Sequence, residues 1–478
     1  MPLDADAPQN PPPAFSKTFD DVAVGDTVSI RRTVTPDDLY VFAHASGNLN
    51  PVHLPSSGEA GDAGQHPAPS MWLGSLFSAI LGNLLPGPGT LYEAQDLRFL
   101  GRAHAGDDLT VTVQVTEKRP PATIVLRTQI FRGEEMLVDG KAEVCPPTER
   151  QKIGDAALPD ITIARHRHVT RLLAACKALP PMPTAVASPE DESSLLGPLE
   201  AMQAGLITPI LVGDAAKIRA VAAAHNAVLG DVEIIDIASH DLAAARAVEL
   251  VHEGRAAAVM KGNLHTDVLL KHVVKSQGGL RGSRRISHVF IMDVPHLHDL
   301  LLVTDAAINI APTLEDKVDI TQNAIDLALA LGIPVPKVGV LAAVEVVNPK
   351  MPATLDAAAL AKMAERGQIH GGIVDGPLAM DNAISLAAAK TKGLISSVAG
   401  RADILVVPNL EAGNILAKEL TYAAQAEGAG IVLGASVPVL LTSRADDATA
   451  RLFSCVTAVL YESWLRTGQS AVPPAPAA

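Results

Sequence analysis

The stretch 256–267, AAAVMKGNLHTD, shows the pattern that decides the fold of the larger part of the chain. Five apolar residues end at Met260, and a polar turn containing Gly262 follows them. A short apolar run is typical of a strand that is buried on both faces, as in a parallel sheet. Ligands bind at the carboxyl ends of such strands. The polar side chains that we expect to line a cleft there are Lys261, Asn263, His265 and Thr266.

The alternation of short apolar strands with amphipathic helices continues on both sides of this stretch. The predicted strands are 209–212, 233–237, 256–260, 288–292, 337–341, 404–407 and 437–441. The predicted helices are 215–226, 241–253, 314–331, 354–366 and 415–426. This order predicts an α/β domain with a largely parallel sheet.

The N-terminal part has a different periodicity. Residues 109–115 alternate apolar and polar side chains, and two further strand patterns follow at 123–131 and 136–144. These three predict an antiparallel meander. The stretch 71–85, MWLGSLFSAILGNLL, has helix length and is almost entirely apolar, so it predicts a buried helix wrapped by the sheet. An antiparallel sheet around one central helix is the α+β arrangement called a hot-dog fold.

These patterns divide the chain into domains. Residues 1–15 and 469–478 are rich in Pro and Ala and predict disordered tails. The hot-dog domain is predicted over 16–148 and the α/β domain, with two subdomains, over 181–468. The linker between them, 149–180, contains a possible connecting helix at 161–178.

Composition excludes several classes of protein. Of 478 residues, 48% are hydrophobic and 3% aromatic, and the net charge is −14, which argues against a nucleic-acid-binding protein. The three cysteines are far apart and form no metal or disulfide pattern, which favours a reducing compartment. The N-terminus lacks the features of a signal peptide, and the most apolar run, 430–442, is too short to span a membrane. We therefore expect a cytoplasmic protein without a membrane partner.

The segment 46–53, SGNLNPVH, carries the strongest local motif of the N-terminal part. With 19–26 and the stretches around Ser75 and Tyr92, it resembles MaoC-like (R)-specific enoyl-CoA hydratases, whose motif reads S-G-D-x-N-P-x-H. The resemblance implies that His53 and the residue at position 48 hold the water, and that Ser75 contacts substrate. Asn48 replaces the family's Asp, and an amide cannot take up a proton at neutral pH. A non-catalytic domain for acyl-CoA binding or dimerisation is therefore the alternative.

Seven segments of the C-terminal part resemble phosphate acetyltransferases and phosphate butyryltransferases, in order and spacing. They are 208–214, 260–267, 287–293, 303–309, 374–381, 403–414 and 437–446. The resemblance implies that acyl-CoA and phosphate are interconverted with acyl phosphate and CoA, both as substrates, with no bound cofactor and no metal. It implies at least a homodimer, acting on small molecules.

The resemblance also implies roles for particular residues. Ser443 and Arg444 would contact the phosphoryl or thioester oxygen, and Asp446 is the candidate base. An acidic protein needs a local basic pocket for phosphate, and the candidates are Arg281, Arg284 and Arg285. Further polar residues at predicted strand ends or helix starts, some of which would be N-caps, are Asn309, Asp375, Asn409 and Asn414. A metal- and NAD-dependent hydroxy-acid dehydrogenase is a weaker alternative, because no carboxylate cluster or G-x-G-x-x-G after a strand supports it.

Overall fold

The computed structural model describes residues 15–54, 66–152, 167–295, 297, 299–441 and 448–473. The chain divides into two compact units, Met1–Ile163 and Ala164–Ala478. Each unit has a hydrophobic core of its own, so each is described by itself.

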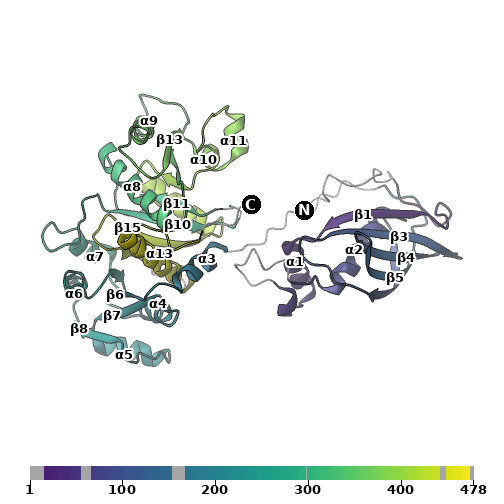
Figure 1. The fold of residues 1–478 in the computed structure, drawn as a ribbon, viewed down its shortest axis with the longest axis horizontal. Coiled ribbons are helices and arrows are strands. Elements are labelled where there is room, and N and C mark those ends of the chain that lie inside the picture. The colour runs from purple at the N-terminus through teal and green to yellow at the C-terminus, as the bar shows by residue number, and fades with distance from the viewer. Residues whose placement is uncertain are drawn as a thin grey trace. The chain divides into compact units, whose positions relative to one another are not determined.

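The N-terminal unit is a five-stranded antiparallel sheet with one buried helix (Figure 1). Its elements are β1 (Thr27–Thr33), α1 (Pro36–Ser46), the 3-10 helix η1 (Pro51–His53), α2 (Ser70–Asn83), β2 (Leu91–Phe99), β3 (Asp108–Arg119), β4 (Thr123–Arg132) and β5 (Glu135–Cys145). The strand order is β1-β3-β4-β5-β2. Helix α2 buries Phe77 and Ile80 in the same core as Val111 and Val113 of β3. The predicted meander and buried helix are confirmed.

The C-terminal unit is built on an eleven-stranded sheet. Its first elements are α3 (Arg167–Cys176), β6 (Met182–Ala187), α4 (Glu192–Gln203), β7 (Ile207–Gly213), α5 (Ala215–Ala224), β8 (Glu233–Asp236), α6 (His240–His252), β9 (Ala258–Lys261) and α7 (Thr266–Val273). The middle elements are β10 (Ser287–Asp293), β11 (Leu301–Thr304), α8 (Leu314–Ala330), β12 (Lys337–Leu341), α9 (Pro352–Glu365), β13 (Ile373–Leu378), α10 (Met380–Ile384) and α11 (Leu386–Thr391). The last are β14 (Ile404–Val406), α12 (Leu410–Tyr422), β15 (Glu427–Leu433), β16 (Val439–Leu440) and α13 (Ala448–Thr467).

The sheet is buried on both faces. Along β6, Val186 belongs to a core that also contains Phe453 and Leu460 of α13. Its neighbours Ala185 and Ala187 belong to a second core, which contains Ala243 and other residues of α6. Side chains alternate between the faces of a strand, so a strand covered on both sides reads as a continuous apolar run. All seven predicted strands of this unit overlap an observed strand.

The sheet consists of two parallel halves that run in opposite directions. The strand order is β13-β12-β14-β11-β10-β15-β16-β9-β6-β7-β8. The first four strands are parallel to one another, as are the last five. Three antiparallel pairings, β11 with β10, β10 with β15, and β15 with β16, join them. The strand direction reverses three times between β11 and β16, so the strands of the two halves run in opposite directions. The carboxyl ends of the strands in one half therefore lie at the edge of the sheet where the strands of the other half begin.

The predicted ends of the domains need correction. Arg150 forms an ion pair with Asp21, and Gln151 pairs with Ser16, so residues 150–152 belong to the N-terminal unit. Helix α3 buries Leu172 in the core of the C-terminal unit. The predicted C-terminal tail is wrong for 469–473, because Val472 is buried and a Cβ on Gly332 would touch it. The prediction failed because a single apolar residue, Val472, is enough to pack against Gly332 at the end of α8.

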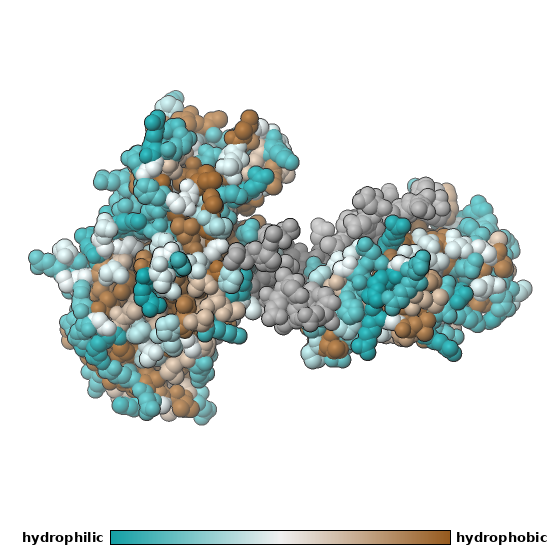
Figure 2. All heavy atoms as spheres, viewed as in Figure 1, coloured by the Kyte–Doolittle hydropathy of each residue, from teal (hydrophilic) through white to brown (hydrophobic). Residues whose placement is uncertain are grey.

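In the view of Figure 2, hydrophobic side chains are scattered among hydrophilic ones on both units. Among the described residues, no helix combines the length and the apolar composition that a membrane span requires.

Candidate active site

The carboxyl end of β9 lies directly against the carboxyl end of β6. The backbone N–H of Gly262 donates to the carbonyl of Ala187 at 2.8 Å, and that of Asn263 donates to the carbonyl of Ser188 at 2.6 Å. A Cβ on Gly262 would lie 2.4 Å from the Ala187 carbonyl oxygen, which is backbone and cannot move aside. Only glycine fits here, so the glycine of the motif holds the following polar residues at the strand end.

Three polar side chains follow this glycine. Asn263 is half-buried, and His265 and Thr266 are exposed where α7 begins. His265 occupies the position before the helix, but its side chain caps no backbone N–H group. Unbonded donors at a helix N-terminus suit an anionic oxygen. Lys261, which precedes them, is buried, and its Nζ donates to the carbonyls of Gly262 and Leu264 at 3.3 and 3.4 Å.

Strand β16 ends at the same place. Leu440 pairs in parallel with Met260 of β9 and in antiparallel with Ile431 of β15. The residues that follow, including Ser443, Arg444 and Asp446, lie outside the described part of the chain. The description resumes in α13, where Arg451 donates to the hydroxyl of Ser193 at 3.2 Å, close to the start of α4. The described residues on either side, Leu440 and Arg451, thus contact the carboxyl end of β9 and the start of α4, which follows β6.

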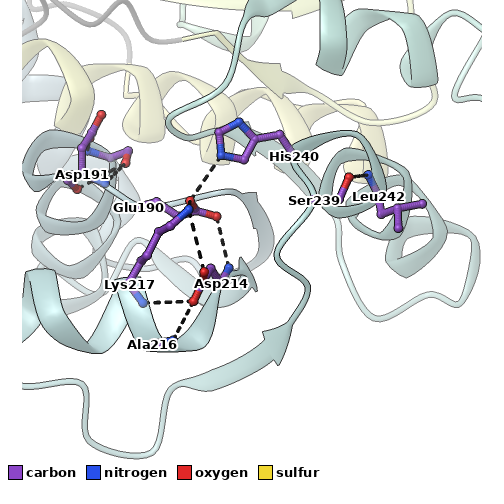
Figure 3. Close-up of polar contacts among 9 residues, drawn as sticks. Glu190, Asp191, Asp214, Ala216, Lys217, Ser239, His240 and Leu242 are labelled. Carbon is purple, nitrogen blue, oxygen red and sulfur yellow. Dashed lines mark hydrogen bonds and ion pairs between the residues drawn. The ribbon is translucent and has the colours of Figure 1, made fainter.

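A buried carboxylate, which the sequence prediction missed, organises the neighbouring loops (Figure 3). The side chain of Glu190 is 3% exposed, and it accepts hydrogen bonds from the backbone of Asp214 and from Lys217 and His240, at 3.1, 3.0 and 3.2 Å. Burial alone would raise the pKa of Glu190, but these hydrogen bonds outweigh it and lower the pKa below its ordinary value. Glu190 therefore links the starts of α5 and α6 to the end of β6.

Ser188, two residues before Glu190, was also missed. It is fully buried, its φ of 54° lies in the left-handed region that non-glycine residues rarely adopt, and its hydroxyl has no hydrogen-bond partner. The sequence signal was available, because the polar run 188–193 directly follows the apolar run of β6. That run was missed because Pro183 interrupts the strand pattern.

The three candidate arginines lie elsewhere, at the amino end of β10. Arg284 forms an ion pair with Asp326 at 2.5 Å. The guanidinium of Arg285 donates to Asn309 at 2.9 Å, and the backbone N–H of Arg285 donates to the carboxylate of Asp319 at 2.8 Å. With Arg281 they line an open cavity of about 610 Å³. The acidic side chains of the same cavity are Glu315, Asp316 and Asp319. The cavity thus carries as many carboxylates as guanidinium groups, which weakens its attraction for an anion.

The other predicted site residues, which belong to the half of the sheet formed by β13, β12, β14 and β11, make hydrogen bonds within the protein. Asn309 donates to the carboxylate of Asp305 and to the carbonyl of Ile286. Asp375 accepts from Ser396. Asn409 is the N-cap of α12, accepting from the N–H of Ala412 at 2.9 Å. Asn414 donates to the carbonyl of Ala306 at 3.3 Å.

The predicted site residues lie at two opposite ends of the large sheet. Asn309, Asp375 and Asn409 follow or end strands of one half of the sheet, whereas Lys261 and Asn263 follow a strand of the other. Alternation of strands and helices predicts parallel pairs, but it does not reveal that the central strands reverse the direction.

In the N-terminal unit, Nδ1 of His53 lies 2.7 Å from the carbonyl oxygen of Pro67. Since a carbonyl only accepts, Nδ1 carries the proton in the neutral ring, and Nε2 keeps a lone pair. Asn48 accepts from the backbone of Asn50 at 3.2 Å, so its amide nitrogen is left for another group. Ser75 donates to the carbonyl of Trp72 at 2.7 Å within its own helix.

Comparison with known proteins identifies the C-terminal unit. A family model described as phosphate acetyl/butaryl transferase matches residues 240–459. The chain is 58% identical to the phosphate acetyltransferase of Rhizobium meliloti over 63% of this chain and 95% of that protein. It is 45% identical to the phosphate butyryltransferase of Clostridium acetobutylicum, over 58% of this chain and 92% of that protein.

Among solved structures, a branched-chain phosphotransacylase from Enterococcus faecalis is 31% identical, with a TM-score of 0.51. The match covers 59% of this chain and 99% of that chain. The fold, the loop at the end of β9 and these similarities agree that the chain belongs to the phosphate acetyl/butyryltransferase family.

Proposed function

We propose that the C-terminal unit transfers a short acyl group reversibly between the thiol of CoA and phosphate, at the carboxyl end of β6, β9 and β16. The observation that carries this assignment is the set of polar side chains, Asn263, His265 and Thr266, that follow β9 without a hydrogen bond to the described protein. CoA and phosphate enter as substrates, and the scheme needs no bound cofactor or metal.

The reaction requires three things of the protein. The phosphate must be bound, and we assign this to His265, Thr266 and the first turn of α7. The oxyanion that develops on the acyl carbon must be stabilised, which suits the guanidinium of Arg444 and the hydroxyl of Ser443. The thiol must lose its proton, and Asp446 is the candidate base. Holding the reactants together supplies much of the rate.

The arginines at the amino end of β10 receive a structural role in this proposal. Arg284 and Arg285 are bonded to Asp326 and Asn309, and those bonds join β10 to α8 and to the loop after β11. Breaking them would leave charged groups without partners in a partly buried position.

The test is thioester formation by the whole chain, from CoA and acetyl, propionyl or butyryl phosphate. We expect turnover that Ser443→Ala and Arg444→Ala each reduce by at least about a hundredfold. Arg219→Ala, an exposed arginine on α5, is the matched control and should leave turnover unchanged. No turnover with any of the three acyl phosphates, in folded protein, would overturn the proposal.

A second function is proposed for the N-terminal unit, as a hot-dog domain that hydrates short trans-2-enoyl-CoA. The observation that favours it is the fixed tautomer of His53, whose Nε2 lone pair can take a proton from water. Asn48 would orient this water by its amide group. We expect hydration that His53→Ala abolishes and Asn48→Asp increases. If neither the wild-type chain nor Asn48→Asp hydrates the substrate, the unit is a non-catalytic acyl-CoA-binding or dimerisation module.

A further inference from the structure

We propose that the two units act in sequence, and that the C-terminal unit is specific for the 3-hydroxyacyl-CoA that the N-terminal unit produces. The inference rests on both parts of the proposed function and names the substrate class of the acyltransferase. The inference concerns the whole chain, in which the two units fold around separate hydrophobic cores and are present in equal amount.

The chemistry allows only one order of the two reactions. Hydration forms a bond from the water oxygen to C3 and moves a proton to C2, and it leaves the thioester intact. Phosphorolysis then forms a bond from a phosphate oxygen to the carbonyl carbon, breaks the carbon–sulfur bond and releases the thiolate, which takes up a proton. The acyl phosphate no longer carries CoA, so phosphorolysis first would remove the handle that a CoA-dependent hydratase needs. Water and phosphate are the only co-reactants, and nothing is oxidised or reduced.

The polarity of the C-terminal site fits a hydroxylated acyl chain. A saturated acyl chain has no hydrogen-bonding group beyond its carbonyl, whereas a 3-hydroxyl both donates and accepts. Asn263 can bind such a hydroxyl through its amide oxygen and nitrogen together. Its side chain is half-buried next to Gly262, and the backbone bond from its N–H to the Ser188 carbonyl, at 2.6 Å, fixes its position. We therefore assign Asn263 as the residue that selects the 3-hydroxyl.

Covalent linkage guarantees that the two sites are made together. The described part of the N-terminal unit ends at Lys152, and that of the C-terminal unit begins at Arg167 of the same chain. Every molecule that hydrates the enoyl-CoA therefore also carries the acyltransferase site that can use the product.

The experiment compares substrates on the whole chain. Hydration is measured alone, without phosphate, as the loss of the ultraviolet absorbance of trans-2-butenoyl-CoA. Phosphorolysis is measured alone, as thiol release from acetyl-CoA, butyryl-CoA and each enantiomer of 3-hydroxybutyryl-CoA. We expect kcat/KM for one enantiomer of 3-hydroxybutyryl-CoA to exceed that for butyryl-CoA by about tenfold or more, the effect of one hydrogen bond.

Two variants locate the effect. Asn263→Ala should lower kcat/KM for 3-hydroxybutyryl-CoA about tenfold more than it lowers kcat/KM for butyryl-CoA, and Asn263→Ser should restore part of the ratio between the two substrates. A merely structural role would lower both substrates equally. His53→Ala should stop thiol release from trans-2-butenoyl-CoA plus phosphate while release from 3-hydroxybutyryl-CoA continues. His44→Ala, an exposed histidine at the end of α1, is its control.

The outcomes separate this inference from the functions beneath it. If hydration and phosphorolysis both proceed but butyryl-CoA is preferred over both enantiomers of 3-hydroxybutyryl-CoA, the inferred order of the two reactions is overturned. The two proposed functions would then still stand. If no hydration is detected, both the inferred order of the two reactions and the hydratase proposal are overturned. The acetyl-CoA assay would still test the acyltransferase proposal by itself.

Discussion

The two ends of the large sheet carry similar polar residues but use them differently. At the end of β9, Asn263, His265 and Thr266 have side chains that the described protein leaves unbonded. At the opposite end, the polar side chains bond to one another, as Arg285 does with Asn309 and Asn309 with Asp305. A polar group that the fold already satisfies contributes to stability, whereas an unsatisfied one is available to a ligand. The comparison is open to four tests.

The largest effect is expected from Asp305→Ala. This carboxylate is buried and accepts hydrogen bonds from the backbone of Ala307, Ile308 and Asn309 and from the Asn309 side chain. Removing it leaves the buried backbone N–H of Asn309 and two part-buried N–H groups without their acceptor, so the free energy of unfolding should fall by at least about 3 kcal/mol. Urea unfolding measures this. A loss below about 1 kcal/mol would show that this end is not the structural one.

The next effect is expected from His265→Ala, at the other end. Acyltransfer should fall about hundredfold because a donor to phosphate is lost. The free energy of unfolding should change by less than about 0.5 kcal/mol, because the side chain is exposed and caps nothing. Steady-state kinetics at varied phosphate concentration measures the loss of acyltransfer, and urea unfolding of the same variant measures the change in the free energy of unfolding. Unchanged kinetics would remove His265 from the site.

Arg284→Ala should produce a smaller change, in stability alone. The guanidinium is 38% exposed and its partner Asp326 is 12% exposed, so the ion pair is screened by solvent. We expect the free energy of unfolding to fall by less than about 1 kcal/mol, with kcat/KM unchanged. A tenfold loss of kcat/KM in protein of unchanged stability would instead make the arginine-lined cavity the phosphate site and reverse the comparison.

The smallest effect at neutral pH, and a growing one in acid, is expected from His288. Burial lowers the pKa of His288 to about 4, and the nearby Asp305 carboxylate opposes that shift only in part. Between pH 6.5 and 4 the unfolded chain binds a proton that the folded chain does not, so the free energy of unfolding falls as the pH falls through this window. His288→Gln should lose less stability than the wild-type chain between pH 7 and pH 4.5. Parallel pH profiles would contradict this.

The sequence predicted the repeated units of the fold better than their assembly. All seven predicted strands of the C-terminal unit exist, because a strand buried on both faces is a continuous apolar run. Strands β6, β11, β13 and β15 were missed; β11 has four residues, and β15 contains Gly428 and Gly430. Strands β11 and β15 form the antiparallel pairings with β10 and β16, so missing these two hid the reversal between the two halves.

The same reasoning explains the outcome for the candidate site. Local motifs could place Asn263 and His265 together after one strand, because the glycine and the polar residues are adjacent in sequence; their role in a site stays a prediction. They could not tell that Asn309 and Asn409 lie at the other end of the strands, since this depends on pairings between distant segments. The polar run that contains Glu190 was visible in the sequence, but the partners of Glu190 were not, because they lie 24 to 50 residues further along the chain.

The division of the chain into two compact units that share no hydrophobic core affects how its unfolding is measured. Each unit should melt cooperatively, so a calorimetric scan should show two transitions, and a single melting temperature is not defined for the whole protein. Heating to between the two transitions would leave one unit folded beside an unfolded one. Thermal inactivation of acyl transfer then reports the stability of the C-terminal unit and not that of the whole chain.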